Sequence, residues 1–375
     1  MDFDFTEEQR LLRDSVERLL ADRYDFEARK RHAAEPDGWS RALWSQYAEL
    51  GLLGVPFSEA DGGFGGGPVE TMIVMQAFGA ALVLEPYFAT VVLGGGLLRH
   101  AGATALLPRI AAGELLLTFA QAERQSRWDL CDVTTAAKCH GAAWRISGEK
   151  SLVVHGDVAD KLLVTARTTG GRRDRDGIGL FLVDADGAGV TRRIYPTQDG
   201  RRAAEIRFAD APAEAVGDPE NAAPVVARVA DEAIAALCAE AVGVMGAMQT
   251  LTVDYLKTRK QFGRAIGEFQ ALQHRAVDMY VALEQARSMA LFATLMASED
   301  DAGERARAMS AAKVQIGKSG RHVGQEAVQL HGGIGVTMEY AVGHHFKRMT
   351  MIEKTLGDTE THLARLAAAG GLIAP

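Results

Sequence analysis

The chain has 375 residues, 47% of them hydrophobic and 24% charged, which is ordinary globular composition with length for two or three packed units. Its net charge is −8, and no basic block is interleaved with aromatic residues, which argues against a nucleic acid as a partner. The three cysteines form no CxxC pair, which argues against a disulfide framework or a metal site and favours buried thiols in a reducing cytoplasm.

Two features of the sequence argue against export and against a membrane span. Its first ten residues are acidic and amphipathic, whereas a secretory signal begins with basic and then apolar residues. The most apolar stretch, residues 77–98, is interrupted by Glu85 and Pro86, so it predicts buried helices joined by a turn instead of a membrane span. We therefore expect a cytoplasmic protein without a membrane partner.

Residues 1–114 are predicted to form an N-terminal helical domain. The apolar residues recur at helical spacing, as in Leu11, Leu12, Val16, Leu19 and Leu20 and again in Leu43, Tyr47, Leu50 and Leu53. The segment 62–68 interrupts the pattern, because five glycines and a proline in seven residues cannot hold a helix. It is either a substrate-facing loop or a plain connector.

Residues 115–215 are predicted to form a middle β domain, an antiparallel barrel or sandwich. Eight short β-rich runs are separated by turn residues with no long helix between them. In chain order they read LLLTFA, TTAA, AWRI, SLVV, KLLVTA, GLFLV, GVTRRI and AAEIRF.

Residues 216–375 are predicted to form a C-terminal helical domain, a four-helix bundle, so that the fold class is α+β. One long apolar stripe at helical spacing opens this region and ends near Tyr255. Such a stripe is typical of a core helix, and further helical segments follow it.

Most self-contained catalytic motifs are missing from the sequence. There is no GxSxG elbow, no Walker A loop, no HExxH helix and no GxGxxG after a strand, which disfavours hydrolase and nucleotide-kinase functions. Six histidines occur in the last third of the chain, but no two of them are spaced at i, i+4, so we expect no metal site.

Two glycine-containing segments could bind an anion. In the first, Arg259 precedes Gly263, and a guanidinium beside a glycine turn can bind a pyrophosphate through two hydrogen bonds. In the second, Gly332, Gly333 and Gly335 break a helix and can free backbone N–H groups. A surface arginine and a simple helix-to-helix turn are the ordinary alternatives.

Four stretches of the chain together resemble the acyl-CoA dehydrogenase family, in the correct order and over nearly the whole length. They are LGVPFSEADGGFGG near residue 60, SGEKSLVVHGDVADKLLVTAR from Ser147, YLKTRKQFGRAIGEFQALQHRAVDM from Tyr255 and AVQLHGGIGVTMEY from Ala327. Within the family the chain is most similar to the small subunit of pimeloyl-CoA dehydrogenase. This resemblance implies an oxidoreductase of fatty acid metabolism that binds FAD, with part of the site supplied by a neighbouring subunit.

The resemblance also implies the cofactor-binding residues. They are Arg259 and Phe262 near the pyrophosphate with Gln261 between them, Gln329, Gly332 and Gly333 toward the FAD of another protomer, Thr359, and Gln121 and Ala122 in the flavin-edge strand Phe119–Glu123. In that strand Ala122 and Arg124 replace the usual Thr and Pro, so a side-chain hydroxyl to the flavin is missing. Leu152 and Val154 stand where the family has a Trp and commonly a Thr.

Desaturation of an acyl thioester requires a base that removes the α proton while a hydride leaves for the flavin. The resemblance places Gly357 and Ala233 at the family's two glutamate positions, so neither carries a carboxylate. Asp358 is the candidate catalytic residue, although it could instead cap the final helix. Glu232 and Glu240 are weaker candidates.

The expected function is therefore an FAD-dependent acyl-CoA dehydrogenase that converts an acyl-CoA to the 2-enoyl-CoA. Pimeloyl-CoA or another dicarboxylyl-CoA is the favoured substrate. We expect a homo- or hetero-oligomer, a dimer or tetramer, with a paralogue, and electron-transfer flavoprotein as the electron acceptor. The alternatives are a non-catalytic subunit that completes the FAD site of the paralogue, and a flavin oxidase or monooxygenase of the same fold.

Overall fold

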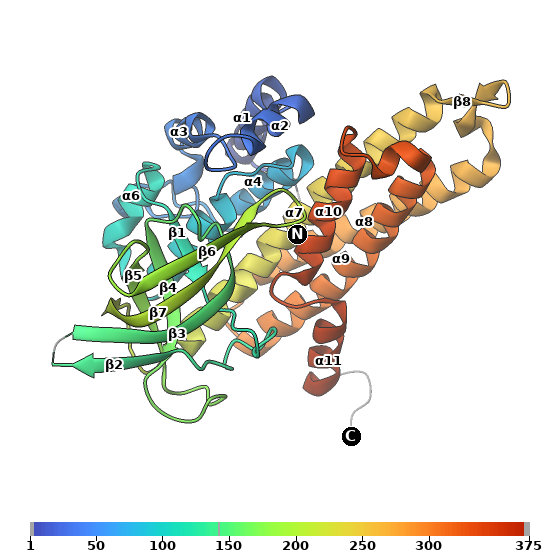
Figure 1. Ribbon diagram of the computed structural model, residues 1–375. Helices are drawn as coiled ribbons and strands as arrows, with labels where there is room; N and C mark the ends of the chain where they lie inside the picture. The colour runs from blue at the N-terminus through green and yellow to red at the C-terminus, as the bar shows by residue number, and fades with distance from the viewer. Residues whose placement is uncertain (1–3, 142, 371–375) are drawn as a thin grey trace. The chain divides into compact units, whose positions relative to one another are not determined.

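The structure is a computed structural model that describes residues 4–141 and 143–370 (Figure 1). Its contacts divide the chain into two compact units, which we call the helical unit and the β unit. The helical unit comprises Met1–Arg31, Pro68–Val83 and Ile234–Pro375, and the β unit comprises His32–Gly67 and Leu84–Ala233. The expected middle region lies wholly in the β unit, whereas the N-terminal helices are divided between the two.

The N-terminal part of the helical unit is built on two helices, α1 (Glu7–Arg23) and α4 (Pro68–Ala81). A capping box starts α1: the Thr6 side chain accepts from the backbone of Gln9, and the Gln9 side chain accepts from the backbone of Thr6. Val16 and Leu20 form the buried face of α1, as the helical spacing predicts.

The predicted C-terminal helical domain is present, and its described residues form five α-helices, of which α7 begins in the β unit. They are α7 (Ala223–Thr258), α8 (Gln270–Met296), α9 (Ala302–His331), α10 (Ala341–Lys354) and α11 (Thr359–Ala369). Helices α8 and α9 run side by side, and a small hairpin of β8 (Lys260–Gln261) and β9 (Arg264–Ala265) lies at the turn between α7 and α8 (Figure 1).

Helices α7 and α4 approach each other closely because glycines face carbonyls at their contact. A β-carbon on Gly243 would lie 1.9 Å from the carbonyl oxygen of Gln76, and one on Gly79 would lie 2.1 Å from that of Glu240. Helix α7 is also long and apolar enough to cross a membrane, but 72% of its most apolar window is buried, which is typical of a core helix.

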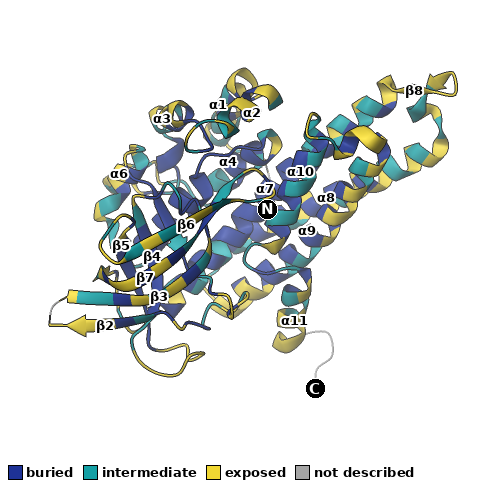
Figure 2. Ribbon diagram, viewed as in Figure 1, coloured by how far each residue is buried: buried dark blue, intermediate teal, exposed yellow. Residues whose placement is uncertain are grey.

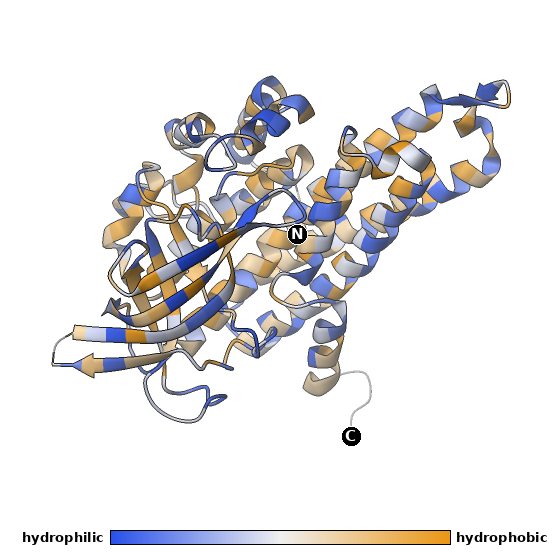
Figure 3. Ribbon diagram, viewed as in Figure 1, coloured by the Kyte–Doolittle hydropathy of each residue, from blue (hydrophilic) through white to orange (hydrophobic). Residues whose placement is uncertain are grey.

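The β unit holds a seven-stranded sheet. Its strands are β1 (Leu117–Ala120), β2 (Ala136–His140), β3 (Ala143–Val154), β4 (Lys161–Arg167), β5 (Ile178–Asp184), β6 (Val190–Pro196) and β7 (Arg202–Ala215). The order β1-β4-β2-β3-β7-β5, with a further β4–β5 pairing, closes the sheet into a barrel, and β6 extends it beyond β7. Strands β4 and β5 are buried along nearly their whole length (Figure 2), and their side chains are mainly apolar (Figure 3).

Two expectations about this sheet were wrong. The sheet is mixed, because β1 pairs with β4 in parallel and Ala136 of β2 also bridges to Arg167 in parallel. The separate runs AWRI and SLVV belong to one strand, β3, whose register with β7 shifts between Ile146 and Gly148 and between Lys150 and Val153. Local sequence patterns cannot distinguish two strands from one strand with bulges.

Short helices complete the β unit. They are α3 (Arg41–Glu49), η1 (Leu52–Gly54), η2 (Glu59–Asp61), a π-helix η3 (Phe88–Gly95), α5 (Gly96–His100), η4 (Thr104–Leu106) and α6 (Leu107–Ala111), while α2 (Phe26–Ala33) crosses the boundary to the helical unit. The expectation of three buried thiols holds for Cys238 alone, since Cys131 is half-buried and Cys139 is exposed.

Candidate functional site

The expected flavin-edge segment is the stretch where the chain leaves β1. The Gln121 side chain is buried and donates to the carbonyl of Asp129 at 3.5 Å. The carbonyl of Ala122 accepts from the backbone N–H of Ser151, in β3, at 2.8 Å. The backbone of this segment is therefore tied to the neighbouring strand.

Glu123 ends this segment as a buried carboxylate whose oxygens are all engaged. It accepts hydrogen bonds from Lys150 Nζ at 2.8 Å, from the Thr135 backbone at 3.0 Å, from Gln125 Nε2 at 2.7 Å, and from both the backbone N–H (2.8 Å) and the hydroxyl of Thr134. Desolvation opposes ionisation, but the charge of Lys150 and these hydrogen bonds lower the pKa of Glu123 to about 2.

Lys150 is the buried partner of that carboxylate, with 0% of its side chain exposed. Its ammonium also donates to the Gln121 carbonyl at 3.0 Å and to the Thr165 hydroxyl at 3.1 Å, so that three donors have three acceptors. Desolvation lowers the pKa of Lys150 to about 8, and Glu123 limits the decrease. The pair stays ionised near neutral pH.

A bulge in β3 contains Leu152, the residue that the resemblance places at the family's Trp position. Leu152 has a φ of +52°, and 49% of it is exposed. A non-glycine residue in the left-handed region costs about 1–3 kcal/mol, which the surrounding contacts must offset. Arg124 is also exposed and lies 3.4 Å from Glu205. This edge of the sheet therefore offers an aliphatic side chain where an aromatic one is usual.

The expected pyrophosphate residues lie on the β8–β9 hairpin of the helical unit. Arg259, Gln261 and Phe262 are exposed there, and 91% of Phe262 is accessible. The Phe262 ring meets Phe269 edge-on at 6.1 Å between centroids. A guanidinium and a large aromatic ring so exposed are available to a ligand or to another chain.

The second expected segment follows α9, where Gly332 begins the short helix η6 (Gly332–Val336). A β-carbon on Gly332 or Gly333 would meet no atom within 4 Å, and Gly332 has a φ of +63°. The imidazole of His331 stacks on Tyr255 at 4.6 Å between centroids. Because Tyr255 precedes Arg259 by one turn of α7, this stack links the two expected FAD segments of the helical unit.

Asp358 is the N-cap of α11, so the structure shows the capping alternative. One carboxylate oxygen accepts from the backbone N–H of Thr361 at 2.9 Å and from its hydroxyl at 2.7 Å, and the other accepts from Lys354 at 3.1 Å. Desolvation opposes the shift, but these hydrogen bonds and the charge of Lys354 lower the pKa of Asp358 to about 2. In this geometry Asp358 is a weak proton acceptor.

Gly357, which the resemblance places at the family's glutamate position, has no room for a side chain. Its φ is +116°, and a β-carbon there would lie 2.6 Å from Nε2 of His362. The His362 ring is fully buried: Nε2 donates to the carbonyl of Leu356 at 3.2 Å, so Nδ1 accepts from the hydroxyl of Ser310 at 3.1 Å. Desolvation and the charges of Arg365 and Lys313 lower the pKa of His362 to about 3, which keeps it neutral.

Thr359 is buried against this loop and bound within its own chain. Its hydroxyl and backbone N–H both donate to Oε1 of Glu353 at 3.1 Å. The buried Lys313 donates to the carbonyls of Ile352, Glu353 and Thr355, which closes the C-terminal end of α10. The loop between α10 and α11 is therefore fixed at both ends.

The two weaker base candidates are both engaged in ion pairs. Glu240 accepts two hydrogen bonds of 2.7 Å from Arg348, and both side chains are buried. Glu232 contacts Arg99 at 2.8 Å and His100 at 2.9 Å, and despite its desolvation these partners lower its pKa. A paired carboxylate accepts a proton poorly, so neither residue fits the role of the base.

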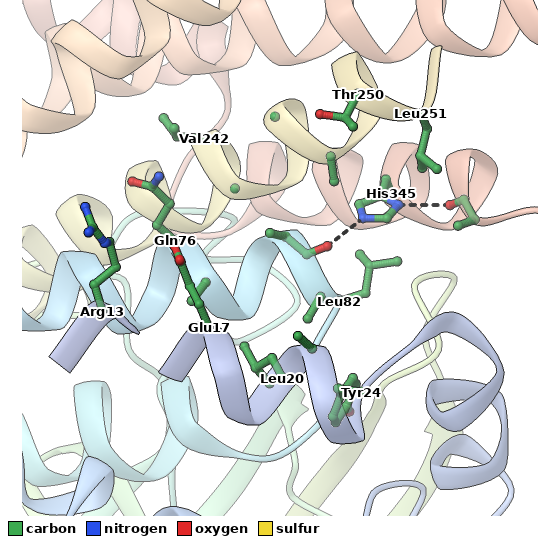
Figure 4. Close-up of a pocket in the computed structure, with 18 of the residues that line it drawn as sticks. Arg13, Glu17, Leu20, Tyr24, Gln76, Leu82, Val242, Thr250, Leu251 and His345 are labelled. Carbon is green, nitrogen blue, oxygen red and sulfur yellow. Dashed lines mark hydrogen bonds between the residues drawn. The ribbon is translucent and has the colours of Figure 1, made fainter. Parts of the chain in front are cut away.

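A pocket of about 700 Å³ lies in the helical unit between α1, α4 and α7 (Figure 4). Its floor is lined by small residues such as Ala77, Gly243 and Gly246, and the buried His345 borders it. None of the residues that we expect to bind FAD or to act on the substrate lines this pocket. It is therefore separate from the expected site.

Sequence analysis missed the buried Lys150, Lys313 and His362, which fix the loops around the expected residues. A signal was present for Lys313, which shares the helical spacing of the apolar Met309 and Ile316, whereas Lys150 lies in a polar segment between two β-rich runs and gave no such signal. The partners that satisfy them are distant in sequence. Over residues 4–141 and 143–370, no group of three His, Cys, Asp or Glu side chains could hold a metal ion.

Three family profiles match successive parts of the chain. The acyl-CoA dehydrogenase N-terminal domain matches residues 6–114, the acyl-CoA dehydrogenase middle domain matches residues 118–211, and the acyl-CoA dehydrogenase C-terminal domain matches residues 225–371. Together they account for most of the sequence.

Relatives and solved structures agree with these profiles. The acyl-CoA dehydrogenase FadE12 of Mycobacterium tuberculosis is 30% identical over 90% of this chain and 89% of its own, and the probable acyl-CoA dehydrogenase YngJ of Bacillus subtilis is 28% identical over both full chains. A chain from a solved variant of the Tcur3481-Tcur3483 steroid ACAD has a TM-score of 0.88 and 30% identity over 97% of both chains. A chain from the solved ChsE4-ChsE5 complex of Mycobacterium tuberculosis has a TM-score of 0.87 and 26% identity over 100% of both chains. This chain belongs to the acyl-CoA dehydrogenase family, whose members are FAD-dependent oxidoreductases.

Proposed function

We propose that this protein is an FAD-dependent acyl-CoA dehydrogenase that works as a subunit of a larger assembly and desaturates an acyl-CoA thioester to the 2-enoyl-CoA. The observation that carries the proposal is that a chain of this family has both a rigidly held backbone at Gln121–Glu123 in its β unit and an exposed hairpin with an arginine and a phenylalanine in its helical unit. Bound FAD would supply the hydride acceptor.

The residues of this chain fit FAD in three respects. The open backbone at Gly332 and Gly333 leaves space for an anion to approach. The exposed guanidinium of Arg259 can bind a phosphate through two hydrogen bonds. Gln121 and Ala122 offer a fixed backbone to the polar edge of the flavin, with no side-chain hydroxyl at Ala122. Gln261, Phe262 and Gln329 are also exposed and are the further residues that we propose to contact FAD.

The source of the base divides the proposal into two forms. In the first, Asp358 leaves Thr361 and Lys354 when the substrate binds, and burial then raises its pKa so that it accepts the α proton. In the second, a carboxylate of a paralogous subunit does so, and this chain completes the FAD site. The low pKa of Asp358 and the ring of His362 against Gly357 support the second form.

An exposed apolar stripe supports an oligomeric assembly. Val277, Tyr280, Val281, Phe292 and Leu295 follow one face of α8, and between 40% and 56% of each is exposed. Such a stripe is typical of a subunit interface. Two of the similar structures carry the names of two proteins, the ChsE4-ChsE5 complex and the Tcur3481-Tcur3483 steroid ACAD, which supports assembly with a second protein. Electron-transfer flavoprotein is the proposed electron acceptor.

Two substrate classes are proposed. A dicarboxylyl-CoA such as pimeloyl-CoA follows from the resemblance to the small subunit of pimeloyl-CoA dehydrogenase. A steroid-bearing acyl-CoA is the second candidate, because the structure described as a steroid ACAD is 30% identical to this chain. Leu152 and Val154 stand where larger or polar residues are usual in the family. Their aliphatic side chains suit the acyl group of either substrate class.

The decisive experiment is an anaerobic titration of the purified protein with pimeloyl-CoA, a steroid acyl-CoA and a plain fatty acyl-CoA, followed by flavin absorbance. It is performed with the protein alone and with its paralogue. We expect bleaching only in the presence of the paralogue. Bleaching by the protein alone would show a complete active site with its own base. The absence of flavin from both samples would refute the proposed function, and rapid reoxidation by oxygen would favour an oxidase.

A further inference from the structure

Two stretches of the β unit carry the expected contacts to the flavin ring: the exit from β1 and the end of β3. Three kinds of contact join them. The Thr118 hydroxyl donates to the Val154 carbonyl at 2.6 Å, the Ser151 N–H donates to the Ala122 carbonyl at 2.8 Å, and the Lys150 ammonium donates to the Gln121 carbonyl and the Glu123 carboxylate at 3.0 and 2.8 Å.

The bulge in β3 makes these contacts possible. Lys150 pairs with Ile206 of β7 and Val153 pairs with Ala204, so β3 has two residues between these positions where β7 has one. Ser151 and Leu152 consequently leave the β3–β7 ladder, and the N–H of Ser151 turns to Ala122 instead. Leu152 takes up the left-handed conformation within the bulge. The local geometry of both stretches thus depends on one irregularity next to Lys150.

Lys150 is the residue that contacts every part of this arrangement. It lies at the start of the bulge, and its ammonium reaches the β1 exit at Gln121 and Glu123 and β4 at Thr165. An ammonium with no exposed surface is costly unless it is paired and fully hydrogen-bonded, and here all three donors are used. An apolar residue would fill the same space at lower cost, but it could not fix a carbonyl.

We propose that Lys150 is a positioning residue for the flavin, because it locks the backbone of Gln121–Glu123 to the bulge that presents Leu152. This inference rests on the proposed function, since it requires that FAD binds at these two stretches. Lys150 touches neither flavin nor substrate in this role. It acts by keeping the backbone at Gln121 and Ala122 and the side chain of Leu152 in a fixed relation.

The test compares variants in the complete assembly with the paralogue. The double substitution Lys150→Met with Glu123→Gln removes both charges and leaves no buried unpaired ion, which a single substitution would. We expect this variant to fold, to bind FAD at least about tenfold more weakly and to show a shifted flavin absorption spectrum. The dissociation constant is measured by flavin fluorescence, and folding by the urea midpoint.

Arg192→Met is the matched control. Arg192 is a basic residue of β6 whose guanidinium fixes the carbonyls of Gly156, Asp157 and Ala159 in the same unit, and it contacts neither stretch. We expect it to lower the urea midpoint but to leave FAD affinity within about twofold. If Lys150 only stabilised the fold, the double variant would behave like Arg192→Met, with a lower urea midpoint and nearly unchanged FAD affinity.

A milder variant keeps the test decisive if the double variant does not fold. Thr165→Val removes one acceptor of Lys150 and retains the ion pair, and we expect a few-fold loss of FAD affinity. Wild-type affinity and spectrum in the double variant, or in Thr165→Val if that alone folds, would overturn the inference and leave the proposed function standing. Absence of FAD binding by the wild-type assembly would overturn both.

Discussion

Asp358 satisfies a structural requirement one residue after Gly357, the position where the resemblance places the family's glutamate. Its two oxygens serve the N-terminus of α11 and Lys354, and its pKa is lowered to about 2. An asparagine also caps a helix well but cannot pair with Lys354, so Asp358→Asn should lower the free energy of unfolding by only about 1 kcal/mol.

We expect Asp358→Asn to reduce turnover of the complete assembly by less than about tenfold, because the carboxylate is already occupied. Turnover is measured as electron transfer from acyl-CoA, and the unfolding curve serves as the control. A loss of about a hundredfold or more in a protein that remains folded would make Asp358 the base.

Gly357 is required by two independent constraints, the backbone conformation and the ring of His362. Gly357→Ala should therefore destabilise the protein by about 2–3 kcal/mol, since the left-handed strain and the overlap add. The matched control is Gly102→Ala, where φ is +70° and no atom lies within 4 Å of the added carbon, so about 1 kcal/mol is expected. Urea unfolding measures both, and equal losses would show that His362 imposes no constraint.

The lowered pKa of Glu123 should make the free energy of unfolding depend on pH in the acid range. Its pKa is about 2 in the folded protein and 4.5 without partners, so its contribution is complete above pH 4.5 and declines as the pH falls toward 2. We expect the wild type to lose roughly 2 kcal/mol more between about pH 5 and pH 3 than the double variant Lys150→Met with Glu123→Gln, which leaves no buried unpaired ion. Urea unfolding at each pH measures this difference, and parallel pH profiles of the two proteins would contradict it.

At the scale of elements, the contact between α4 and α7 depends on which glycines face a carbonyl. Gly243→Ala should cost about 1–3 kcal/mol, because its β-carbon would lie 1.9 Å from the carbonyl oxygen of Gln76. Gly246→Ala, one turn along the same helix, meets only Arg287 Nη2 at 3.8 Å and should stabilise the protein by up to about 1 kcal/mol. Thermal or urea unfolding distinguishes the two, and a neutral Gly243→Ala would contradict the close contact.

In the β unit, the bulge in β3 likewise determines how two elements contact each other. A regular strand would keep the N–H of Ser151 in the ladder with β7, whereas the bulge directs it to Ala122. One extra residue in a strand therefore couples the barrel wall to the segment after β1, which is the role that bulges commonly have beside functional sites.

At the scale of the whole molecule, the stripe on α8 predicts assembly through that helix. Replacing Val277 and Val281 by Glu places two charges on the stripe and should shift the protein to smaller species with less bound FAD, while the urea midpoint changes little because both residues are exposed. Analytical ultracentrifugation and the flavin-to-protein absorbance ratio measure the two effects.

Leu11→Glu is the control for this change, since Leu11 is 61% exposed on α1 and lies outside the stripe. It should leave the assembly state unchanged. If the α8 variant remained as large as the wild type, the stripe would not be the interface.

The sequence by itself determined the succession of helical, β-rich and helical regions, the family, and the loop near residues 62–68, which ends one residue earlier than predicted because Pro68 begins α4. These depend on local periodicity, on glycine and proline positions and on contiguous motifs, all of which are readable over short windows. Asp358 could be named from its position beside Gly357, and its competing role as a cap could be named from its position before Thr359.

The tertiary structure showed the cap at Asp358, which is formed by the nearby Thr361 and Lys354, and it alone showed which other side chains are paired with partners distant in sequence. Arg348 pairs with Glu240 across 108 positions, Lys150 reaches Glu123 across 27, and His362 reaches Ser310 across 52. The parallel pairing of β1 with β4 and the division of the N-terminal helices between two units have the same origin. Local patterns specify which segments fold, but the ionisation and availability of a side chain depend on what the fold brings next to it.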